Sequence, residues 1–549
     1  MHEELKKAIY EAVKAQQKDC GCDFSIPGVE LEHPKDMRYG DISTNVAMKI
    51  GKLQRKDPMA IAENLVKQLD PGLVRMTQRR IEKVEAVKPG FINFYFSSDY
   101  YQKKVQEIIS AGKKFADSNI GEGKKTQVEF LSANPTGPAH LGNARGGFYG
   151  DVLANTFQKF GFKVEREYYV NDGGGQVIKL AKSILAEAEI IPGDERVYSG
   201  VYIKKWVDEN RAFIEENKDD QQKIGYKAAW DVMNDYIKPS IEKMHIKFDE
   251  FFSEKTLLES GAVEKTIDEL KKKKLTYKKD QALWLKTTEF GDDQDRVLVK
   301  SDGMYAYIAP DIAYHYNKFG ERKFDHVVDV FGTDHHGYVK RLLTATAALG
   351  YPGQLDIRLL QLVRLIQKGK ELRMSKRAGT AVTFDELLDL IGTKDASDVA
   401  RFFFLSRDLD THMDFDLDLA KDTSEKNPVY YVKYASARIN GILRNATIDY
   451  SKPNLGLIKK PAEIDLIKKL IELPEIVEQV ASDKKYPVHK FAYYITEVAE
   501  KFHKFYHDYR VVSDDAELTK ARLALVAATK NVLEITGEDI LGINIPERM

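Results

Sequence analysis

One short segment of the sequence combines phosphate-binding side chains with a backbone that a ligand can approach closely. Residues 133–143 read ANPTGPAHLGN, and their prolines and glycines predict a loop. His140 and Asn143 stand three positions apart at the start of a predicted helix, so they share one side of its first turn. Both side chains can hydrogen-bond phosphate oxygens. Gly142 leaves room for a flat ring or a phosphate group beside the backbone.

The elements predicted on either side of this loop would position it for ligand binding. Residues 127–131 read as a buried strand, and residues 144–160 read as a helix with small residues in its first turn. A helix N-terminus that follows a loop presents unpaired N–H groups, which favours an anion. The alternative is an ordinary strand–helix connection in which His140 and Asn143 are incidental. A second phosphate-binding segment is needed to decide between them.

A second segment of this kind stands late in the chain. Residues 368–371 read KGKE and residues 373–376 read RMSK, a basic loop that contains a glycine. Such a loop can close over a triphosphate, and lysine suits charge that appears during a reaction because it is a flexible point charge. Taken alone, a solvated loop explains these residues equally well. If this basic loop and the loop that contains HLGN belong to the same sheet, the two together favour a nucleotide site.

A third polar loop contains two adjacent histidines. Residues 332–337 read GTDHHG and follow the apolar strand predicted over residues 324–331. Open α/β sheets bind ligands at such carboxyl ends of strands. Adjacent histidines rarely chelate one ion, and no cysteine or carboxylate cluster stands beside them at ligand spacing. We therefore predict nucleotide contact by Gly332, His335 and His336 and no metal site, with a plain polar loop as the alternative.

The composition predicts a soluble protein of several domains. The chain has 549 residues, of which 43% are hydrophobic and 31% charged. No apolar run approaches membrane-spanning length, and the N-terminus has an amphipathic pattern with acidic residues, unlike a signal peptide. The net charge is -1, so RNA binding would need local basic patches. Cys20 and Cys22 have a poor spacing for zinc or redox chemistry, and we predict reduced thiols in a cytoplasmic protein.

The two phosphate-binding segments together resemble the signature motifs of the class I aminoacyl-tRNA synthetases. These enzymes carry a HIGH motif early and a KMSK motif late in a Rossmann-type domain, and here the motifs read HLGN and RMSK. The surrounding text VEFLSANPTGPAHLGNARGG is similar to the arginyl-tRNA synthetases in particular. The resemblance covers nearly the whole chain. It implies ATP-dependent attachment of L-arginine to tRNA through an arginyl-adenylate, with Mg²⁺ accompanying ATP.

The resemblance also assigns roles to the motif residues. His140 and Asn143 would bind phosphate or ribose, and Lys376 with Arg373 would stabilise the departing pyrophosphate. Two of the departures from the family motifs matter for the chemistry. Asn143 replaces the second histidine and cannot become cationic, while Arg373 replaces the first lysine and changes the geometry of the charge. The remaining ATP-binding residues implied by the resemblance are Gly142, Gly332, His335, His336, Met374 and Ser375.

An amino-acid pocket follows from the same resemblance. It implies four arginine-binding residues, Glu129, Asn134, Tyr307 and Asp311. Their chemistry suits the substrate, because a guanidinium needs carboxylate partners, ideally with two parallel hydrogen bonds. The α-ammonium group would take one acid, and Glu129 or Asn134 is placed for that. Without the resemblance, Tyr307 and Asp311 would be read as an ordinary helix start.

The domain organisation implied by the resemblance is multidomain α/β. Residues 1–118 form an N-terminal α/β domain that would contact the outer corner of the tRNA. Residues 119–395 form a Rossmann-type parallel-sheet catalytic domain with a helical insertion at about 176–290. In this domain we expect further strands over residues 163–170, 296–299 and 358–365.

Residues 396–549 read as an all-α helical bundle, similar to the anticodon-binding domain named for a DALR motif. That motif reads DVAR here. Three nearby aromatic residues could stack on unpaired bases or belong to the core: Tyr430, Tyr431 and Tyr434.

Two rival functions remain compatible with the motifs. One is a class I synthetase for another amino acid, although an enzyme for cysteine would need zinc ligands that the two cysteines cannot provide. The other is a catalytically silent tRNA-binding relative, which the retained HLGN, Ser375 and Lys376 argue against. We expect a monomer whose partners are tRNA, L-arginine and ATP, without membrane association.

Overall fold

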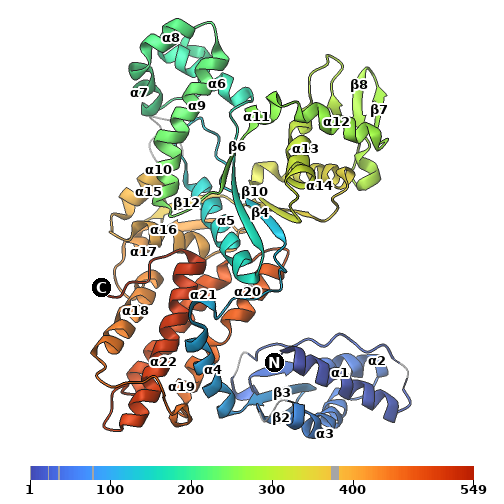
Figure 1. Cartoon of the computed structure of the whole chain (residues 1–549), viewed down its shortest axis with the longest axis vertical. Coiled ribbons are helices and arrows are strands. Elements are labelled where there is room, and N and C mark those ends of the chain that lie inside the picture. Colours follow the sequence, from blue (N-terminus) through green and yellow to red (C-terminus); the bar gives the residue numbers. More distant parts are fainter. Residues whose placement is uncertain (1, 23, 35–36, 77–79, 373–381) are drawn as a thin grey trace. The chain divides into compact units, whose positions relative to one another are not determined.

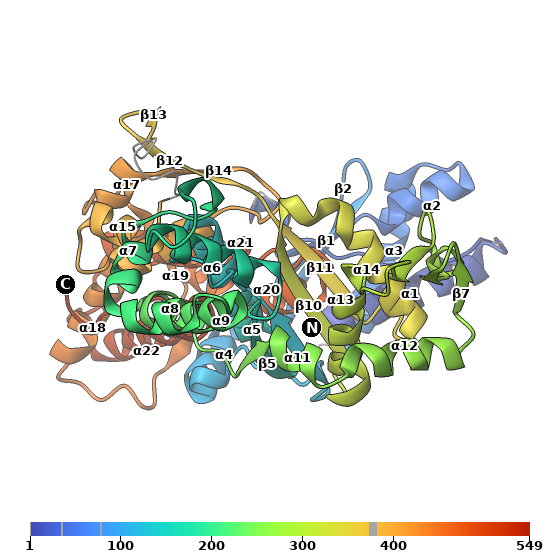
Figure 2. The ribbon, with the colours of Figure 1, turned by 90° about the horizontal axis from the view of Figure 1, so that it is seen from above.

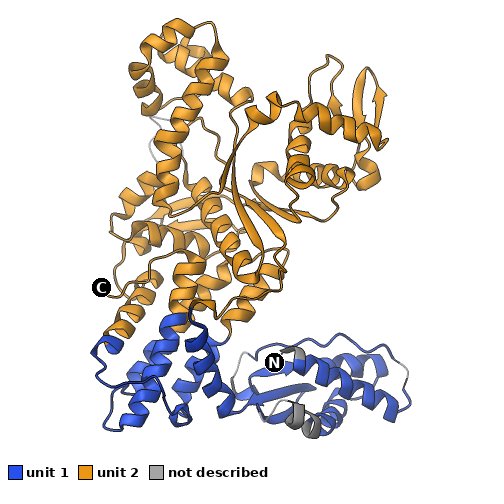
Figure 3. Cartoon of the chain, viewed as in Figure 1, with its two compact units in different colours: residues 1–112, 442–471, 501–531 blue, residues 113–441, 472–500, 532–549 orange. Residues whose placement is uncertain are grey.

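The structure is a computed structural model that describes residues 2–22, 24–34, 37–76, 80–372 and 382–549. It divides into two compact units, each assembled from separate stretches of the chain (Figure 3). The first comprises Met1–Gly112, Ile442–Ile471 and Lys501–Asn531. The second comprises Lys113–Gly441, Glu472–Glu500 and Val532–Met549.

The first unit begins with a small α/β arrangement. A three-stranded antiparallel sheet has the order β1–β3–β2, and α1 and α3 pack against each other beside it. The elements are α1 (His2–Asp19), β1 (Ile42–Thr44), α2 (Val46–Gln54), α3 (Pro58–Met76), β2 (Ile81–Val87) and β3 (Phe91–Phe96). The N-terminal α/β domain predicted from the sequence is therefore confirmed. β1 ends at Thr44, and α2 begins two residues later.

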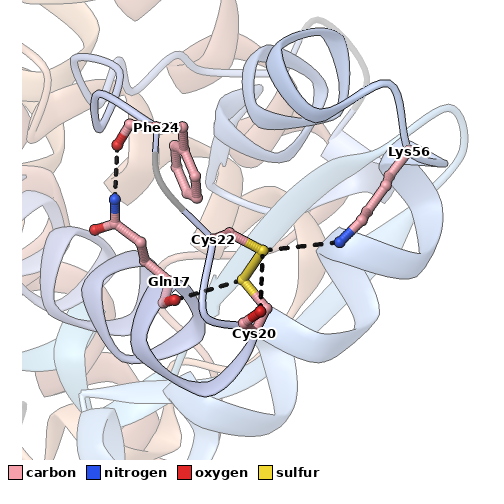
Figure 4. Close-up of a disulfide and its surroundings, with 5 residues drawn as sticks. All are labelled: Gln17, Cys20, Cys22, Phe24 and Lys56. Carbon is pink, nitrogen blue, oxygen red and sulfur yellow. Dashed lines mark hydrogen bonds between the residues drawn. A yellow bond between two sulfur atoms is a disulfide. The ribbon is translucent and has the colours of Figure 1, made fainter.

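The two cysteines are joined in a disulfide, which corrects the prediction of reduced thiols (Figure 4). α1 ends at Asp19, and Gly21 adopts φ +58°, a left-handed conformation that glycine accepts without strain. This turn brings the Cα atoms of Cys20 and Cys22 to 5.2 Å, within the usual span of a disulfide. Lys56 Nζ lies 3.8 Å from Cys22 Sγ. The prediction of reduced thiols failed because the spacing of the two cysteines does not show that α1 ends there and that the chain turns back.

A five-stranded parallel sheet is the centre of the second unit. Its order is β11–β10–β4–β5–β6, and every neighbouring pair runs parallel (Figure 1). The strands are β4 (Lys125–Glu129), β5 (Lys163–Val170), β6 (Glu250–Ser253), β10 (His326–Gly332) and β11 (Leu355–Leu360). From β4 the chain adds β5 and β6 on one side of the sheet. Later it adds β10 and β11 on the other side. The order therefore reverses between β4 and β10, which is where such sheets bind ligands.

Helices pack on this sheet. α5 (Leu141–Phe160) packs on β4, β5 and β10, while α14 (His336–Leu349) packs on β11 (Figures 1 and 2). The approach of α5 is close, because a Cβ on Gly150 would lie 2.1 Å from Phe130 Cγ. α13 (Ile308–Tyr316) packs against α14 and continues into the π-helical segment η6 (Asn317–Glu321). The predicted Rossmann-type parallel sheet is confirmed.

One strand predicted from the sequence belongs to a different sheet. β9 (Arg296–Val299) was expected in the parallel sheet, but it belongs to an antiparallel sheet with β7 (Thr276–Lys279) and β8 (Ala282–Leu285). The edge strand that pairs with β5 in the parallel sheet is instead β6, a short strand within the predicted insertion. Apolar runs this short identify a strand without identifying its partner.

The single strand expected over residues 358–365 is two strands. β11 ends at Leu360, and β12 (Val363–Gln367) pairs with β13 (Lys370–Glu371) and β14 (Met413–Asp416). β14 also interrupts the stretch from residue 396 that was predicted to be entirely helical. Its sequence, MDFD, is too short for its alternation to stand out.

Helices make up the rest of the second unit and the remainder of the first. The predicted helical insertion contains α6 (Gly175–Glu187), α7 (Val201–Glu209), α8 (Arg211–Asn217), α9 (Gln221–Val232) and α10 (Lys238–Lys243), and several of them share an apolar core. The later helices are α15 (Phe384–Ile391), α16 (Ala396–Leu405), α18 (Pro428–Asn445), α19 (Pro461–Leu470), α20 (Leu473–Ser482), α21 (His489–Asp508) and α22 (Ala516–Glu534). Within the described ranges, every helix is too short or too polar to cross a bilayer.

Candidate active site

The HLGN loop forms the N-terminus of α5, and its polar side chains cap the helix. His140 Nδ1 accepts a hydrogen bond from the Gly142 N–H at 3.1 Å, and Asn143 Oδ1 accepts one from the His140 N–H at 3.0 Å. A nitrogen that accepts carries no proton, so the His140 ring is neutral with its proton on Nε2. Burial also lowers the pKa of His140. The groups left for a ligand are therefore two donors, His140 Nε2–H and the Asn143 amide.

The chain that leaves the RMSK segment is hydrogen-bonded to the HLGN loop. The Leu141 N–H donates to the Val382 carbonyl at 3.1 Å, and the Phe384 N–H donates to the Ala139 carbonyl at 2.9 Å. This antiparallel contact also pairs His140 with Thr383. Residues far apart in sequence thus meet at the start of α5, and the described chain resumes directly beside the proposed phosphate site. The predicted residues Arg373, Met374, Ser375 and Lys376 themselves lie outside the described residues.

The histidine loop lies at the carboxyl end of β10, next to β4 in the sheet. Gly332 ends the strand, and His336 begins α14. The side chain of His335 is 53% exposed, and its ring contacts Phe331. The loops that follow β4 and β10 therefore flank the point where the strand order reverses.

The four predicted arginine-binding residues occupy different environments. Glu129 ends β4 and is 5% exposed, whereas Asn134 is exposed in the HLGN loop. Tyr307 precedes α13 and is 84% exposed. Asp311 stands in the first turn of α13, where it accepts a hydrogen bond from the Tyr338 hydroxyl. Burial raises the pKa of both carboxyl groups, Glu129 and Asp311.

Tyr169 on β5 is a side chain whose pKa is affected by the charges of these acids. Its ring lies 4.6 Å from the ring of Tyr314, whose hydroxyl contacts Glu129 Oε2 at 2.9 Å. Burial is the main reason why the pKa of Tyr169 is raised, and the negative charges of Glu254, Asp311 and Glu129 raise it further. The charges of three carboxylates therefore act on one side chain of β5.

Glu254 is a candidate that sequence reasoning missed. It begins α11 (Glu254–Glu259), directly after β6. Burial raises its pKa, and the nearby Asp311 raises it further. In the part of the chain that the structure describes, Glu254 Oε2 and Asn171 Oδ1 are buried oxygens that accept no hydrogen bond of standard geometry. Recognising EFFS as a strand of the parallel sheet would have placed Glu254 at its carboxyl end.

The candidate site contains no cluster suited to a resident metal. Over the described ranges, no group of three or more histidine, cysteine, aspartate or glutamate residues could hold an ion. The acids of the pocket are distributed along different elements and face tyrosines or cations. Their arrangement suits a cationic organic ligand next to a phosphate-binding helix N-terminus.

Comparisons with known proteins agree with this reading. Residues 104–401 match the family model described as tRNA synthetases class I (R), catalytic domain. Together with the parallel sheet and the HLGN loop, this match defines a class I aminoacyl-tRNA synthetase. Residues 3–96 match the arginyl tRNA synthetase N terminal domain, and residues 432–549 match the DALR anticodon binding domain.

Full-length relatives identify the particular family. The chain is 40% identical to the arginine–tRNA ligase of Shouchella clausii, covering 100% of this chain and 98% of that protein. It is 40% identical to the arginine–tRNA ligase of Bacillus subtilis, covering 100% and 99%. The arginyl-tRNA synthetase structure from Thermus thermophilus has the same fold, with a TM-score of 0.76 at 19% identity over 100% of both chains. The chain belongs to the arginyl-tRNA synthetases.

Proposed function

We propose that the chain joins L-arginine to its tRNA in two steps catalysed at the β4–β10 switch point. In the first, the arginine carboxylate attacks the α-phosphate of ATP, which enters with Mg²⁺, and pyrophosphate leaves. In the second, the arginyl group of the adenylate passes to the terminal ribose of tRNA. Neither step requires a covalent bond to the protein. Catalysis therefore consists of positioning the reactants and stabilising phosphate charge.

The observation that carries the ATP assignment is the hydrogen-bonded contact between the HLGN loop and residues 382–384. It supports a site in which both signature segments act on one nucleotide. His140 Nε2–H would donate to phosphate, the Asn143 amide would donate to phosphate or ribose, and Gly142 would admit the adenine ring. Lys376, supported by Arg373, would stabilise the pyrophosphate as it departs. The other proposed ATP contacts are Gly332, His335, His336, Met374 and Ser375.

The arginine assignment rests on the group of acids around Tyr169. A guanidinium is a planar fork of five donors, and two carboxylates can receive it without leaving a buried charge unpaired. We assign Asp311 and Glu254 to the guanidinium and Glu129 to the α-ammonium. Asn134 would bind polar atoms of the same substrate, and the exposed Tyr307 would cover it when bound.

The anticodon end of the tRNA would contact the helices of residues 432–549, which match the DALR anticodon binding domain. Tyr434 on α18 is 46% exposed, and the Arg438 guanidinium lies 4.8 Å from the centre of its ring. Tyr430 is buried, so it belongs to the core. An exposed aromatic ring beside a cation suits an unpaired base. We further propose that the protein acts as a monomer in the cytoplasm.

The discriminating experiment measures both steps with all twenty amino acids. ATP–pyrophosphate exchange, run with and without tRNA, reports activation, and transfer of radiolabelled amino acid to total tRNA reports charging. We expect arginine to be preferred in both. Preferred charging of another amino acid would replace the substrate assignment, and tRNA binding without either reaction would indicate a silent relative.

A further inference from the structure

The proposed ammonium ligand, Glu129, is one of three acids aligned across the parallel sheet. Asp329 on β10 and Glu167 on β5 are its register partners on the two sides, so the three carboxylates lie on one face of the sheet. All three are buried. Like charges on neighbouring strands repel each other, and burial removes the water that would screen them. The row therefore requires cations from whatever covers it.

The π-helical segment η6 and the residue that follows it supply these cations at helical spacing. Lys318 is fully buried, and its Nζ donates to Glu129 Oε2 at 2.6 Å and to Asp329 Oδ1 at 2.9 Å. Four residues later, Arg322 donates to Glu167. Lys318 and Arg322 therefore face the same way, each toward a different part of the row. Lys318 is the cation that bridges the proposed ammonium ligand to its neighbour.

The other groups around Glu129 cannot replace Lys318. The Tyr314 hydroxyl contacts both Glu129 and Glu167, yet it has one hydrogen and serves one carboxylate at a time. His315 Nε2 faces Asp329 Oδ2 at 2.9 Å, on the far side of that carboxylate. Tyr169 carries a negative neighbour in Glu254 and has no charge of its own to offer. Among the residues that the structure describes, Lys318 is thus the positive charge in direct contact with Glu129.

The contacts also orient the Glu129 carboxylate. Oε2 is occupied by Lys318 and Tyr314. In the described part of the chain, Oε1 receives a single long contact, 3.4 Å from Ser132 Oγ. Oε1 is therefore the oxygen left for a further donor. An ammonium group is such a donor, and it binds well only if the carboxylate is ionised.

We propose that Lys318 is a positioning residue for arginine, which keeps Glu129 ionised and turned so that Oε1 receives the α-ammonium of the substrate. The inference rests on the proposed role of Glu129. Burial raises the pKa of Glu129, and Lys318 is the strongest influence that lowers it. Loss of Lys318 therefore raises the pKa of Glu129 further, which favours the protonated carboxyl group and weakens its attraction for an ammonium group.

The test removes Lys318 in a background that keeps the buried charges balanced. Lys318→Met alone would leave both Glu129 and Asp329 without their cation, and the protein could unfold for that reason. We therefore compare the double variant Lys318→Met/Asp329→Asn with Asp329→Asn. The two proteins differ only at Lys318. Circular dichroism and thermal unfolding establish that both fold before kinetics are measured.

The readout is the KM for arginine in ATP–pyrophosphate exchange, measured across the pH range in which both proteins stay folded. At the lower end of that range we expect the double variant to need about tenfold more arginine than Asp329→Asn, or more, the scale of a lost hydrogen bond to a charged group. The difference should shrink as pH rises, because Glu129 then ionises. The KM for ATP should be equal in the two proteins.

Adding Glu129→Gln to both proteins completes the test. Glutamine does not ionise, so the Lys318-dependent pH effect should disappear if it acts through Glu129. An equal arginine KM with and without Lys318 overturns the inference, as does a raised KM with no change in pH profile. If the double variant does not fold, Lys318→Gln/Asp329→Asn keeps a hydrogen-bond donor and receives the same measurements. Normal arginine binding by Glu129→Gln alone would instead refute the proposed role of Glu129.

Discussion

Asp311→Asn is the substitution that tests the arginine pocket most directly. It keeps the size of the side chain and removes its charge. The Tyr338 hydroxyl, which donates to Asp311 Oδ2, would still find an oxygen on asparagine, so the first turn of α13 should retain its conformation. The substitution therefore removes a negative charge from the proposed guanidinium site while the surrounding backbone keeps its conformation.

The expected magnitude follows from how many acids the pocket contains. Removing the sole partner of a buried charge costs about 3–5 kcal/mol, and losing one charged hydrogen bond costs about 1.5–3 kcal/mol. Glu254 lies close enough for its pKa to be raised by Asp311, so it would retain part of the interaction. We therefore expect a loss of about 2–4 kcal/mol, which is about 30-fold to about 700-fold in arginine affinity.

The assay is the arginine dependence of ATP–pyrophosphate exchange, with ATP dependence measured in parallel. The KM for ATP should stay near that of the wild type, because the proposed ATP contacts lie in other loops. Citrulline, neutral where arginine is charged, should be discriminated against less by the variant. Asp280→Asn is the matched control, since Asp280 is exposed in the turn between β7 and β8.

The pH dependence gives a second measurement of the same residue. Burial raises the pKa of Asp311, and binding of a guanidinium requires the ionised form. As pH falls through that raised pKa, the wild type should need more arginine, and this contribution should be absent from Asp311→Asn. Near-normal arginine affinity in Asp311→Asn would refute the reasoning, and Asp311 would then be an ordinary residue of a helix start.

Four further substitutions separate the other proposed roles. Lys376→Ala should lower the rate of activation far more than it weakens arginine binding, because the charge of Lys376 would act mainly in the transition state. Single-turnover kinetics measure the rate, and an arginine titration measures the binding. His140→Asn should keep the helix cap and the melting temperature but lower the activation rate, since asparagine caps well and lacks the Nε2–H donor. His140→Ala loses the cap as well, at about 1 kcal/mol of stability by thermal unfolding. Tyr434→Ala should raise the KM for tRNA by about 5-fold to about 140-fold, which corresponds to about 1–3 kcal/mol of lost stacking, and should leave the KM for arginine unchanged.

The sequence predicted the elements with strong patterns and missed those that depend on distant partners. The strand, loop and helix around His140 were predictable because proline, glycine and an apolar run mark each boundary. The in-register row of acids was not, because residues 129, 167 and 329 become neighbours only through the strand order. β6 was hidden inside a charged, helical stretch, and Glu254 was missed with it. The disulfide depends on a glycine turn at a helix end that the cysteine spacing does not reveal.

The buried charges suggest how the proposed pocket would distinguish the two positively charged ends of arginine. Both the ammonium and the guanidinium need a carboxylate, so the acids must differ in what they already contact. Glu129 meets a point charge, Lys318, through one oxygen, which leaves one oxygen for a compact ammonium group. Asp311 and Glu254 come from separate elements, α13 and α11, and together can receive the broad fork of a guanidinium. A lysine side chain would satisfy one of these two acids and leave the other charged and buried, which would disfavour it.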